Sequence, residues 1–282
     1  RFHAMAEPSL FPTPQQYATC SDLEVRLYAS RLHVKLCGEA AELLLSPLTA
    51  DFARHILDAV SIPAVLAAIL TPKLCSPGQP REVEQALHET VLRALETASG
   101  LRSIVCDMAM MVATDPAVDS LHQPFLFFKG FHALLVHRVA SSLWSTGVPV
   151  QKSVALFLQA RASELFGVDI HPAASIGSGV MLDHASGVVI GSTAVVGNDV
   201  YILHAVTLGS TGKLVAKGSK RHPTVGSHCV LGAGCSILGD VVIGNGSSVG
   251  AAAVVTRDVP PGCTVVGINR LIPARTGPTS KL

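Results

Sequence analysis

The sequence predicts an α + β protein in which an all-helical N-terminal domain leads into a left-handed parallel β-helix of hexapeptide repeats. The first observation is a series of thirteen large aliphatic residues in the C-terminal part, mostly six positions apart. A six-residue period is neither helical nor a simple strand alternation, and it is typical of a solenoid whose inward side chains stack. These anchors are Ile170, Ile176, Leu182, Ile190, Val196, Ile202, Leu208, Val225, Leu231, Ile237, Ile243, Val249 and Val255.

The second observation is the distribution of aromatic residues and glycines. All nine phenylalanines and the only tryptophan precede Ile170, and Tyr201 is the sole Phe, Tyr or Trp after it. Eighteen of the 24 glycines lie beyond Gly167. A thin prism has no room for large rings and needs a tight turn at each corner, so the change in composition predicts a domain boundary near residue 167.

Before residue 168 the apolar pattern is helical. Residues 51–70 carry apolar side chains at helical spacing behind Asp51, a candidate N-cap, and Pro63 divides them into two helices. Further helices are predicted over 82–99, ending at Gly100, over 131–144 and over 154–166. We therefore expect an N-terminal extension, partly helical or disordered, over 1–44, a helical domain over 45–167, the β-helix over 168–272 and a tail over 273–282.

Composition narrows the possible partners and the location. A net charge of +1 and the lack of a long apolar run argue against binding to nucleic acid or to a membrane. The seven cysteines include no CxxC pair, so we expect reduced thiols, mostly in the core. No secretory signal is visible, and we expect a cytoplasmic protein. An organellar location stays open, because Arg1 is not a natural start and Met5 is a candidate initiator.

Two interruptions of the repeat mark the places where chemistry is expected. After Leu182, eight residues replace six, and the extra length falls beside an adjacent acid and histidine, Asp183 and His184. After Leu208, about a dozen residues leave the prism as an extruded loop over about 211–223. Loops of this length on a rigid scaffold are usually functional.

Each candidate also has a purely structural explanation. His184 and Asp183 could form a surface pair, and Asp169 could satisfy backbone donors where helix becomes coil. The cations of the loop could be a solvated face; they are Lys213, Lys217, Lys220 and Arg221. The loop lacks the glycine spacing that a phosphate loop requires, no dinucleotide fingerprint follows a strand, and no metal-ligand cluster is visible. We therefore predict no metal site.

A resemblance to a known family is carried by the motifs Asp115-Pro116-Ala117, Lys129-Gly130-Phe131-His132-Ala133, residues 166–173, Leu182-Asp183-His184, residues 208–213 and Arg221-His222-Pro223. These motifs are similar to those of serine O-acetyltransferases. The resemblance runs from about residue 45 to 275 and includes the helical domain, which other hexapeptide transferases lack. It implies transfer of acetyl from acetyl-CoA to the hydroxyl of L-serine, which gives O-acetylserine for cysteine synthesis. Acetyl-CoA would be a cosubstrate, and no bound cofactor is expected.

The resemblance also implies roles for individual residues. His184 would be the general base, because histidine titrates near neutrality, and Asp169 would fix its tautomer. A zwitterionic substrate needs carboxylates for its ammonium and a cation for its carboxylate. The implied serine-binding residues are Asp115, Asp183, Arg221 and His222, and the implied acetyl-CoA contacts are Gly209, Thr211, Gly212, Lys213, Lys220 and Ala233.

The resemblance implies homotrimers, or dimers of trimers, with active sites that use two subunits, and L-cysteine as a feedback inhibitor. Three residues depart from the family pattern: Ser192 replaces a glutamate, Ser210 a glycine and Lys220 an aspartate. These changes could alter acetyl-CoA affinity or cysteine inhibition. The chain ends in Leu282 rather than in the isoleucine through which many relatives bind O-acetylserine sulfhydrylase, so no tight complex is expected.

Three other functions are compatible with this fold. A related hexapeptide acetyltransferase would acetylate a sugar or an antibiotic, but Asp115 and the helical domain argue against it. A serine-site relative would accept another acyl-CoA or a serine-like amino acid. A catalytically silent scaffold is the non-enzyme alternative, and the intact set of acid, histidine and arginine argues against it.

Overall fold

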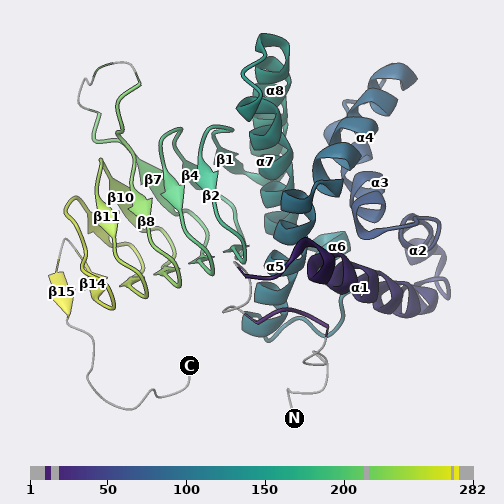
Figure 1. The fold of residues 1–282 in the computed structure, drawn as a ribbon, viewed down its shortest axis with the longest axis horizontal. Helices are drawn as coiled ribbons and strands as arrows, with labels where there is room; N and C mark the ends of the chain where they lie inside the picture. The colour runs from purple at the N-terminus through teal and green to yellow at the C-terminus, as the bar shows by residue number, and fades with distance from the viewer. Residues whose placement is uncertain (1–9, 14–18, 213–215, 217, 268–269, 273–282) are drawn as a thin grey trace.

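The computed structural model describes residues 10–13, 19–212, 216, 218–267 and 270–272. A helical unit is followed by a prism of short parallel strands (Figure 1). The helices are α1 (Asp22–Leu43), α2 (Pro47–Leu57), α3 (Ile62–Leu74), α4 (Arg81–Glu96), α5 (Ala98–Thr114), α6 (His122–Phe127), α7 (Lys129–Ser145) and α8 (Pro149–Phe166). The predicted tail over 273–282 lies outside the described residues.

The helical unit begins earlier than residue 45. Within the segment assigned to an extension, α1 spans 22 residues behind a capping box formed by Ser21 and Glu24. It packs against α2 and α5. Its buried side chains recur every three or four residues, so the segment expected to be partly helical contains a helix that belongs to the helical unit. These side chains form an apolar stripe of Val25, Ala29, Leu32, Leu36 and Ala40.

Pro63 lies in the first turn of α3 and so separates two helices as predicted, but the helix ends differ elsewhere. Ser46, not Asp51, caps α2. Gly100 does not end a helix, because it lies in the first turn of α5, a helix that the sequence pattern did not predict. A Cβ on Gly100 would lie 2.4 Å from the carbonyl oxygen of Ala94, so glycine permits a close approach between α5 and the end of α4.

The strands form three walls in which strands of successive coils pair in parallel, and the last strand, β15, pairs antiparallel with β14. The first wall contains β1 (Val168–Ile170), β4 (Val188–Ile190), β7 (Thr207–Gly209), β10 (Ser236–Leu238) and β13 (Val254–Val255). The second contains β2 (Ser175–Ile176), β5 (Val195–Val196), β8 (Thr224–Val225) and β11 (Val242–Ile243). The third contains β3 (Met181–Leu182), β6 (Tyr201–Ile202), β9 (Val230–Leu231), β12 (Ser248–Val249), β14 (Thr264–Val266) and β15 (Arg270–Ile272).

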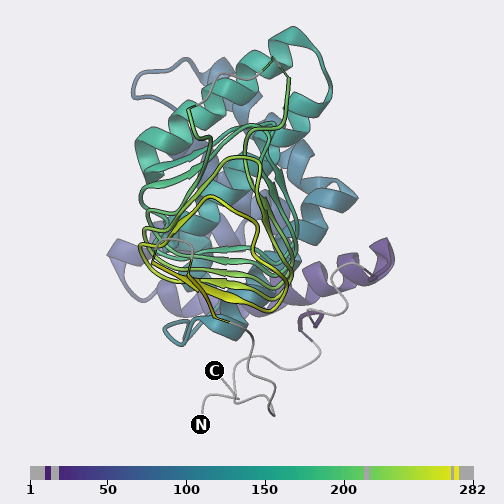
Figure 2. The same ribbon diagram turned by 90° about the vertical axis from the view of Figure 1, so that its left-hand side faces the viewer.

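The anchors stack inside the triangular coils, which Figure 2 shows end on. In the first wall Ile170 pairs with Ile190, and Ile190 pairs with Leu208. All the anchors are buried except Ile176, which is partly exposed beside a cavity next to Arg138. The parallel β-helix that the six-residue period predicted is therefore confirmed.

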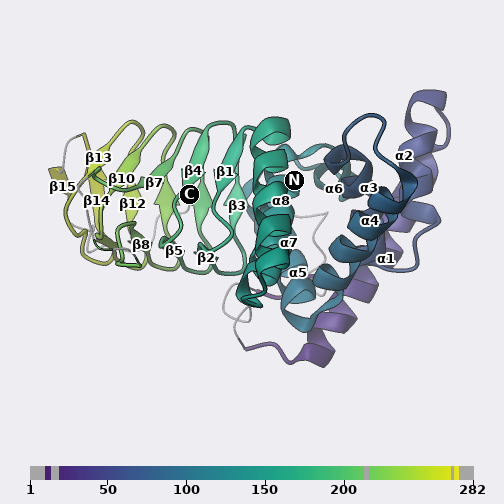
Figure 3. The ribbon, with the colours of Figure 1, turned by 90° about the horizontal axis from the view of Figure 1, so that it is seen from above.

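Helices α7 and α8 stand against the first coil of the prism (Figure 3). Arg138 of α7 forms a buried, two-pronged ion pair with Asp107 of α5, with N···O distances of 2.8 and 2.9 Å. The same guanidinium donates to the carbonyl oxygen of Gly177 at 2.9 Å, and Asp107 accepts from the backbone N–H of Val180 at 2.9 Å. These bonds fix α5 and α7 to the prism and satisfy a charge pair that burial would otherwise penalise.

None of the helices in the described part of the chain is long and apolar enough to cross a membrane. All seven cysteines are free thiols, and Cys20, Cys106, Cys229 and Cys235 are buried, as the sequence predicted.

Candidate active site

Most of the predicted site residues lie on two different edges of the prism, whereas Asp115 lies in the helical unit and Asp169 on the first wall. The acidic edge, where the chain turns from the third wall to the first, carries Asp183, His184 and His204. The basic edge, where it turns from the first wall to the second, carries His171, Thr193, Lys220, Arg221 and His222. Since the first wall separates these edges, one chain does not bring the two groups together.

Asp183 is the centre of the acidic edge. Its side chain is 18% exposed, and its Oδ1 lies 3.8 Å from Nε2 of His184. Its Oδ2 accepts a hydrogen bond of 2.7 Å from the hydroxyl of Tyr201 on β6. The His184 ring is 74% exposed and meets the His204 ring edge to face at 5.8 Å. An accessible histidine next to an oriented carboxylate suits proton transfer.

Asp115 comes from the helical unit, at the end of α5. Its Oδ1 accepts from the backbone N–H of Ala117 at 2.8 Å. The preceding residue, Thr114, donates its hydroxyl to Sδ of Met181 on β3 at 3.2 Å, which holds the end of α5 against the third wall. Burial, the bond to Asp183, and the charges of Asp183 and Asp115 all raise the pKa of Tyr201. Asp115, Asp183 and Tyr201 thus lie within electrostatic reach of one another.

The turn that carries His184 has an unusual backbone. His184 and Ala185 have φ values of 57° and 58°, in the left-handed region that residues other than glycine avoid. The N–H of Ala185 donates to the carbonyl oxygen of Asp183 at 2.6 Å, and that of Ser186 to His184 at 2.7 Å. A single residue in this conformation also occurs at other corners of the prism, at Asp199, Ala205, His228 and Ala252, so the distinguishing feature of this turn is that two such residues are adjacent. Each non-glycine residue in this conformation costs about 1–3 kcal/mol.

Thr193 holds the basic edge together. Its Oγ1 accepts from the backbone N–H groups of Arg221 and His222, at 3.0 and 3.2 Å. Its own N–H donates to Nδ1 of His222 at 3.1 Å, and its carbonyl oxygen accepts from Nζ of Lys220 at 2.9 Å. Because Nδ1 of His222 accepts this bond, the ring proton of the neutral imidazole is on Nε2.

The His222 ring lies against Gly191, where a Cβ would be 2.1 Å from Nε2. Burial, followed by the charges of Arg221, Lys220 and His171, lowers the pKa of His222 and favours this neutral form. Among the described residues, the guanidinium of the exposed Arg221 has no partner. The basic edge therefore presents the unpaired guanidinium of Arg221 next to the neutral imidazole of His222, whose orientation is fixed.

Asp169 does not contact His184 within the chain. It is the middle residue of β1, with its side chain directed away from the buried Val168 and Ile170. Its Oδ1 accepts a hydrogen bond of 2.6 Å from Nε2 of Gln159 on α8, and no hydrogen bond joins it to His184 among the described residues. The implied contact between Asp169 and His184 is thus not formed in one chain.

The implied acetyl-CoA contacts are also divided between the edges. Gly209 ends β7, and Thr211, Gly212 and Lys220 follow on the basic edge, whereas Ala233 lies on the acidic edge two coils beyond His184. Lys213 lies outside the described residues.

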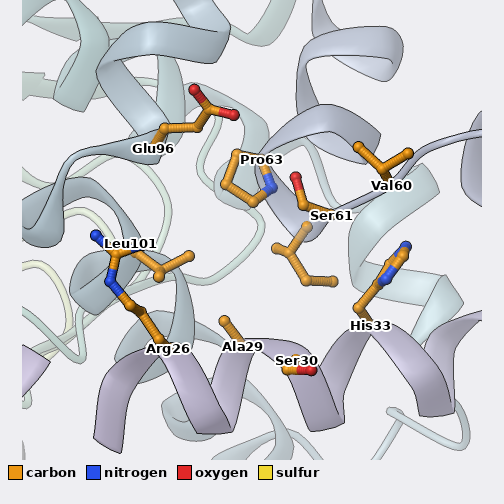
Figure 4. Close-up of a pocket in the computed structure, with 10 residues that line it drawn as sticks. Arg26, Ala29, Ser30, His33, Val60, Ser61, Pro63, Glu96 and Leu101 are labelled. Carbon is orange, nitrogen blue, oxygen red and sulfur yellow. The ribbon is translucent and has the colours of Figure 1, made fainter. Parts of the chain in front are cut away.

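A cavity of about 450 Å³ opens in the helical unit between α1, α3, the end of α4 and the start of α5 (Figure 4). Arg26, Ser61 and Glu96 contribute to its lining, and it includes none of the predicted site residues. In the described part of the chain, no three His, Cys, Asp or Glu side chains converge as metal ligands would.

Two residues of the site were not identified from the sequence. Tyr201 stood out only as the lone aromatic residue of the prism, which was a usable signal for a special role. Thr193 gave no signal, because its function depends on pairing with a loop 27 to 29 residues later in the chain.

Comparisons with known proteins identify the family. A family model described as serine acetyltransferase, N-terminal, matches residues 33–135, and a model of bacterial transferase hexapeptide repeats matches residues 222–257. The serine acetyltransferase of Buchnera aphidicola is 43% identical over 244 residues, covering 86% of each chain. That of Escherichia coli K12 is 39% identical over 251 residues, covering 89% of this chain and 87% of its own.

Solved structures show the same relationship. The crystal structure of Neisseria gonorrhoeae serine acetyltransferase superposes with a TM-score of 0.81 at 43% identity, covering 88% of this chain and 93% of its own. A serine acetyltransferase in complex with cysteine gives 0.80 at 38% identity, with 86% and 99% coverage. Similarity at this level extends over both the helical unit and the prism. The chain belongs to the serine acetyltransferase family, a family of acyltransferase enzymes.

Proposed function

We propose that the protein transfers the acetyl group of acetyl-CoA to the hydroxyl of L-serine, releasing CoA and O-acetyl-L-serine, as the first step of cysteine biosynthesis in the cytoplasm. Family membership supports the reaction. The observation that carries it to this chain is the acidic edge, where Asp183 lies beside the exposed His184 and is bonded to Tyr201, and where Asp115 of the helical unit is within electrostatic reach of Tyr201. Two carboxylates next to a histidine suit an amino acid with a hydroxyl.

The proposed chemistry is direct transfer. The His184 ring accepts the proton of the serine hydroxyl as its oxygen attacks the thioester carbonyl, and a tetrahedral oxyanion forms. Collapse of this intermediate breaks the carbon–sulfur bond, and the departing thiolate takes the proton from the imidazolium. A thiolate is a good leaving group, so no strong additional acid is needed. Asp169 is proposed to orient the imidazole.

The division of the site between two edges favours a site shared by two copies. The ammonium of serine would meet Asp115 and Asp183 on one copy, and its carboxylate would meet Arg221 and His222 on the next. A head-to-tail interface of this kind closes into a ring, and a trimer suits a three-edged prism. The free guanidinium of Arg221 and the distance between the edges along the first wall both support this assembly.

Two such trimers could pair through their helical units. Large apolar side chains on α1, on α2 and between them are solvent-exposed in the single chain, which supports a further contact there. They are Leu23 at 77% exposure, Val34 at 71%, Leu45 at 88% and Leu48 at 85%.

Acetyl-CoA is proposed to lie along the groove between adjacent prisms. Gly209, Thr211 and Gly212 of one copy and Ala233 of its neighbour would then face the same groove, although they lie on different edges of one chain. Lys220 and Lys213 would supply positive charge for phosphates.

L-cysteine is proposed as an inhibitor that competes with serine, because it presents the same ammonium and carboxylate. Solved family structures in complex with serine and with cysteine support this proposal.

The experiment that decides the proposed reaction measures CoA release from acetyl-CoA with and without L-serine. Release that does not depend on serine, or that is equal with a sugar acceptor, would overturn the proposed substrate.

A further inference from the structure

The backbone turn that carries His184 is held from two sides. Bonds from neighbouring coils hold the prism side: the N–H of Asp183 donates to Ile202 at 2.8 Å, and the N–H of Ala205 donates to the carbonyl oxygen of Ser186 at 2.8 Å. The N–H of Gly187 donates to Gly167 at 2.7 Å. These bonds fix the ends of the turn. They do not by themselves explain why two successive non-glycine residues stay left-handed.

The other side is closed by the first turn of α7. A Cβ on Gly130 would lie 2.0 Å from the carbonyl oxygen of Leu182 and 3.2 Å from Cβ of Ala185, so the helix backbone contacts the turn directly on both sides of Asp183 and His184. Lys129, the first residue of α7, donates a hydrogen bond from Nζ to Oγ of Ser186.

Helix α7 is itself rigidly attached. The ion pair of Arg138 with Asp107, and the bond from Arg138 to Gly177, join the middle of α7 to α5 and to the first coil. The start of the helix therefore cannot shift freely relative to the prism, and it can hold the turn against relaxation.

We propose that Lys129 and Gly130 are positioning residues that clamp the turn over 183–186 in its left-handed conformation and so aim His184 and Asp183 at the acceptor. This inference rests on the proposed role of His184 as the base. Gly130 acts by leaving room for the Leu182 carbonyl, and Lys129 acts by holding Ser186.

The first test is Gly130→Ala, which inserts a methyl group against Leu182 and Ala185, the residues on either side of Asp183 and His184. The methyl group should displace the turn and with it the side chains of Asp183 and His184. A misplacement of reacting groups by about 1 Å lowers kcat by about 10- to 100-fold, so we expect a loss of that size. The matched control is Gly244→Ala, on the edge between the second and third walls, where a Cβ would lie 2.3 Å from the backbone nitrogen of Pro261. The control should lower Tm and leave kcat close to wild type below Tm.

The second test replaces Lys129 and does not depend on tolerance of a clash. Lys129→Met should lower kcat by about 3- to 10-fold, the effect of losing one hydrogen bond, and Lys129→Arg should restore most of it. Lys152→Met is the control, because it removes a lysine that lies over Trp144 and away from the turn.

Amide hydrogen exchange supplies a readout that is independent of activity. The N–H groups of Ala185 and Ser186 should exchange faster in the Lys129→Met and Gly130→Ala proteins and not in the controls. Wild-type kcat and unchanged exchange in both Lys129→Met and Gly130→Ala would overturn the clamp, and so would faster exchange without loss of kcat. His184→Ala is measured alongside: if it retains activity, the assignment of the base fails, whereas the exchange result still reports on the clamp.

Discussion

Tyr201 donates its hydroxyl to Oδ2 of Asp183 at 2.7 Å, and this bond occupies one of the two carboxylate oxygens. The other oxygen, Oδ1, faces His184. A carboxylate held in this way presents a fixed acceptor to an ammonium group, and this geometry depends on the only Phe, Tyr or Trp side chain after Ile170.

Tyr201→Phe should therefore weaken serine binding. Loss of one charge-assisted hydrogen bond raises the KM for serine by about 5- to 20-fold, while the KM for acetyl-CoA and kcat change little. Initial-rate kinetics with each substrate varied in turn separates these effects. A variant that loses kcat at unchanged serine KM would show that the hydroxyl serves the chemical step instead.

His184→Ala tests the base itself. Removal of a general base lowers kcat by about 10²- to 10⁴-fold while the fold persists, because the ring is exposed and supports no core contact. Circular dichroism and the thermal midpoint verify folding. Turnover near the wild-type value in a folded variant would remove His184 from the mechanism.

Substrate charge is tested by Asp115→Ala and Arg221→Ala. Each should weaken serine binding by about 1.5–3 kcal/mol, the usual scale for a charge-assisted hydrogen bond, and should change acetyl-CoA binding less. Calorimetry with each ligand measures both effects. Serinamide and N-acetylserine should be poor acceptors of acetyl in the wild-type protein, and efficient acetylation of either would show that one charged end of serine is not read.

The prism could be predicted from sequence because its signal is repeated in every coil. Anchors such as Ile190 and Leu208 pair in the register that the six-residue period implies. The same period exposed the two interruptions, since an irregular spacing is visible only against a regular one. Those interruptions contain the Asp183 and His184 pair and the loop that carries Arg221.

The helical unit was less predictable because its core depends on tertiary contacts. α1 buries a narrow stripe, and Gly100 acts as a packing residue rather than as a helix end. The spacing of the α1 stripe is helical, but it does not show which helices the stripe packs against, and the local sequence does not distinguish a glycine at a close contact from one at a helix end. The bond from Thr193 to His222 and the bond from Gln159 to Asp169 were likewise inaccessible, because each joins segments whose spatial relation exists only after folding.

Buried histidines should make the fold sensitive to mild acid. Burial first, then the charge of Lys73, lowers the pKa of His132 from 6.5 to about 4, against the raising effect of its bond to Phe125. Burial lowers that of His137 to about 3. Between pH 6.5 and these values the two histidines bind more protons in the unfolded chain than in the folded one, so their contribution to the free energy of unfolding falls as pH falls, by up to ~1.4 kcal/mol per pH unit for each histidine. Asp107 and Asp199, whose pKa values burial raises to about 6, act in the opposite direction.

Urea unfolding at pH 7.0 and 5.5 measures this dependence. His132→Gln keeps a donor for the carbonyl oxygen of Phe125 and removes the titrating group, so its stability should change less between the two conditions than that of the wild-type protein. Equal pH dependence in both proteins would show that His132 does not cause the acid sensitivity.

A mixture of two inactive variants tests whether the acidic edge of one copy works with the basic edge of another. His184→Ala damages the first edge and Arg221→Ala the second, so each protein alone should have little activity when serine is kept well below the KM of the Arg221→Ala protein. If the two are unfolded together and refolded at equal amounts, random assembly of a closed ring leaves about a quarter of the sites with both edges intact. Activity should rise toward that fraction of wild type. Mixing without unfolding is the control, and mixed assemblies without recovered activity would show that each site is built within one chain.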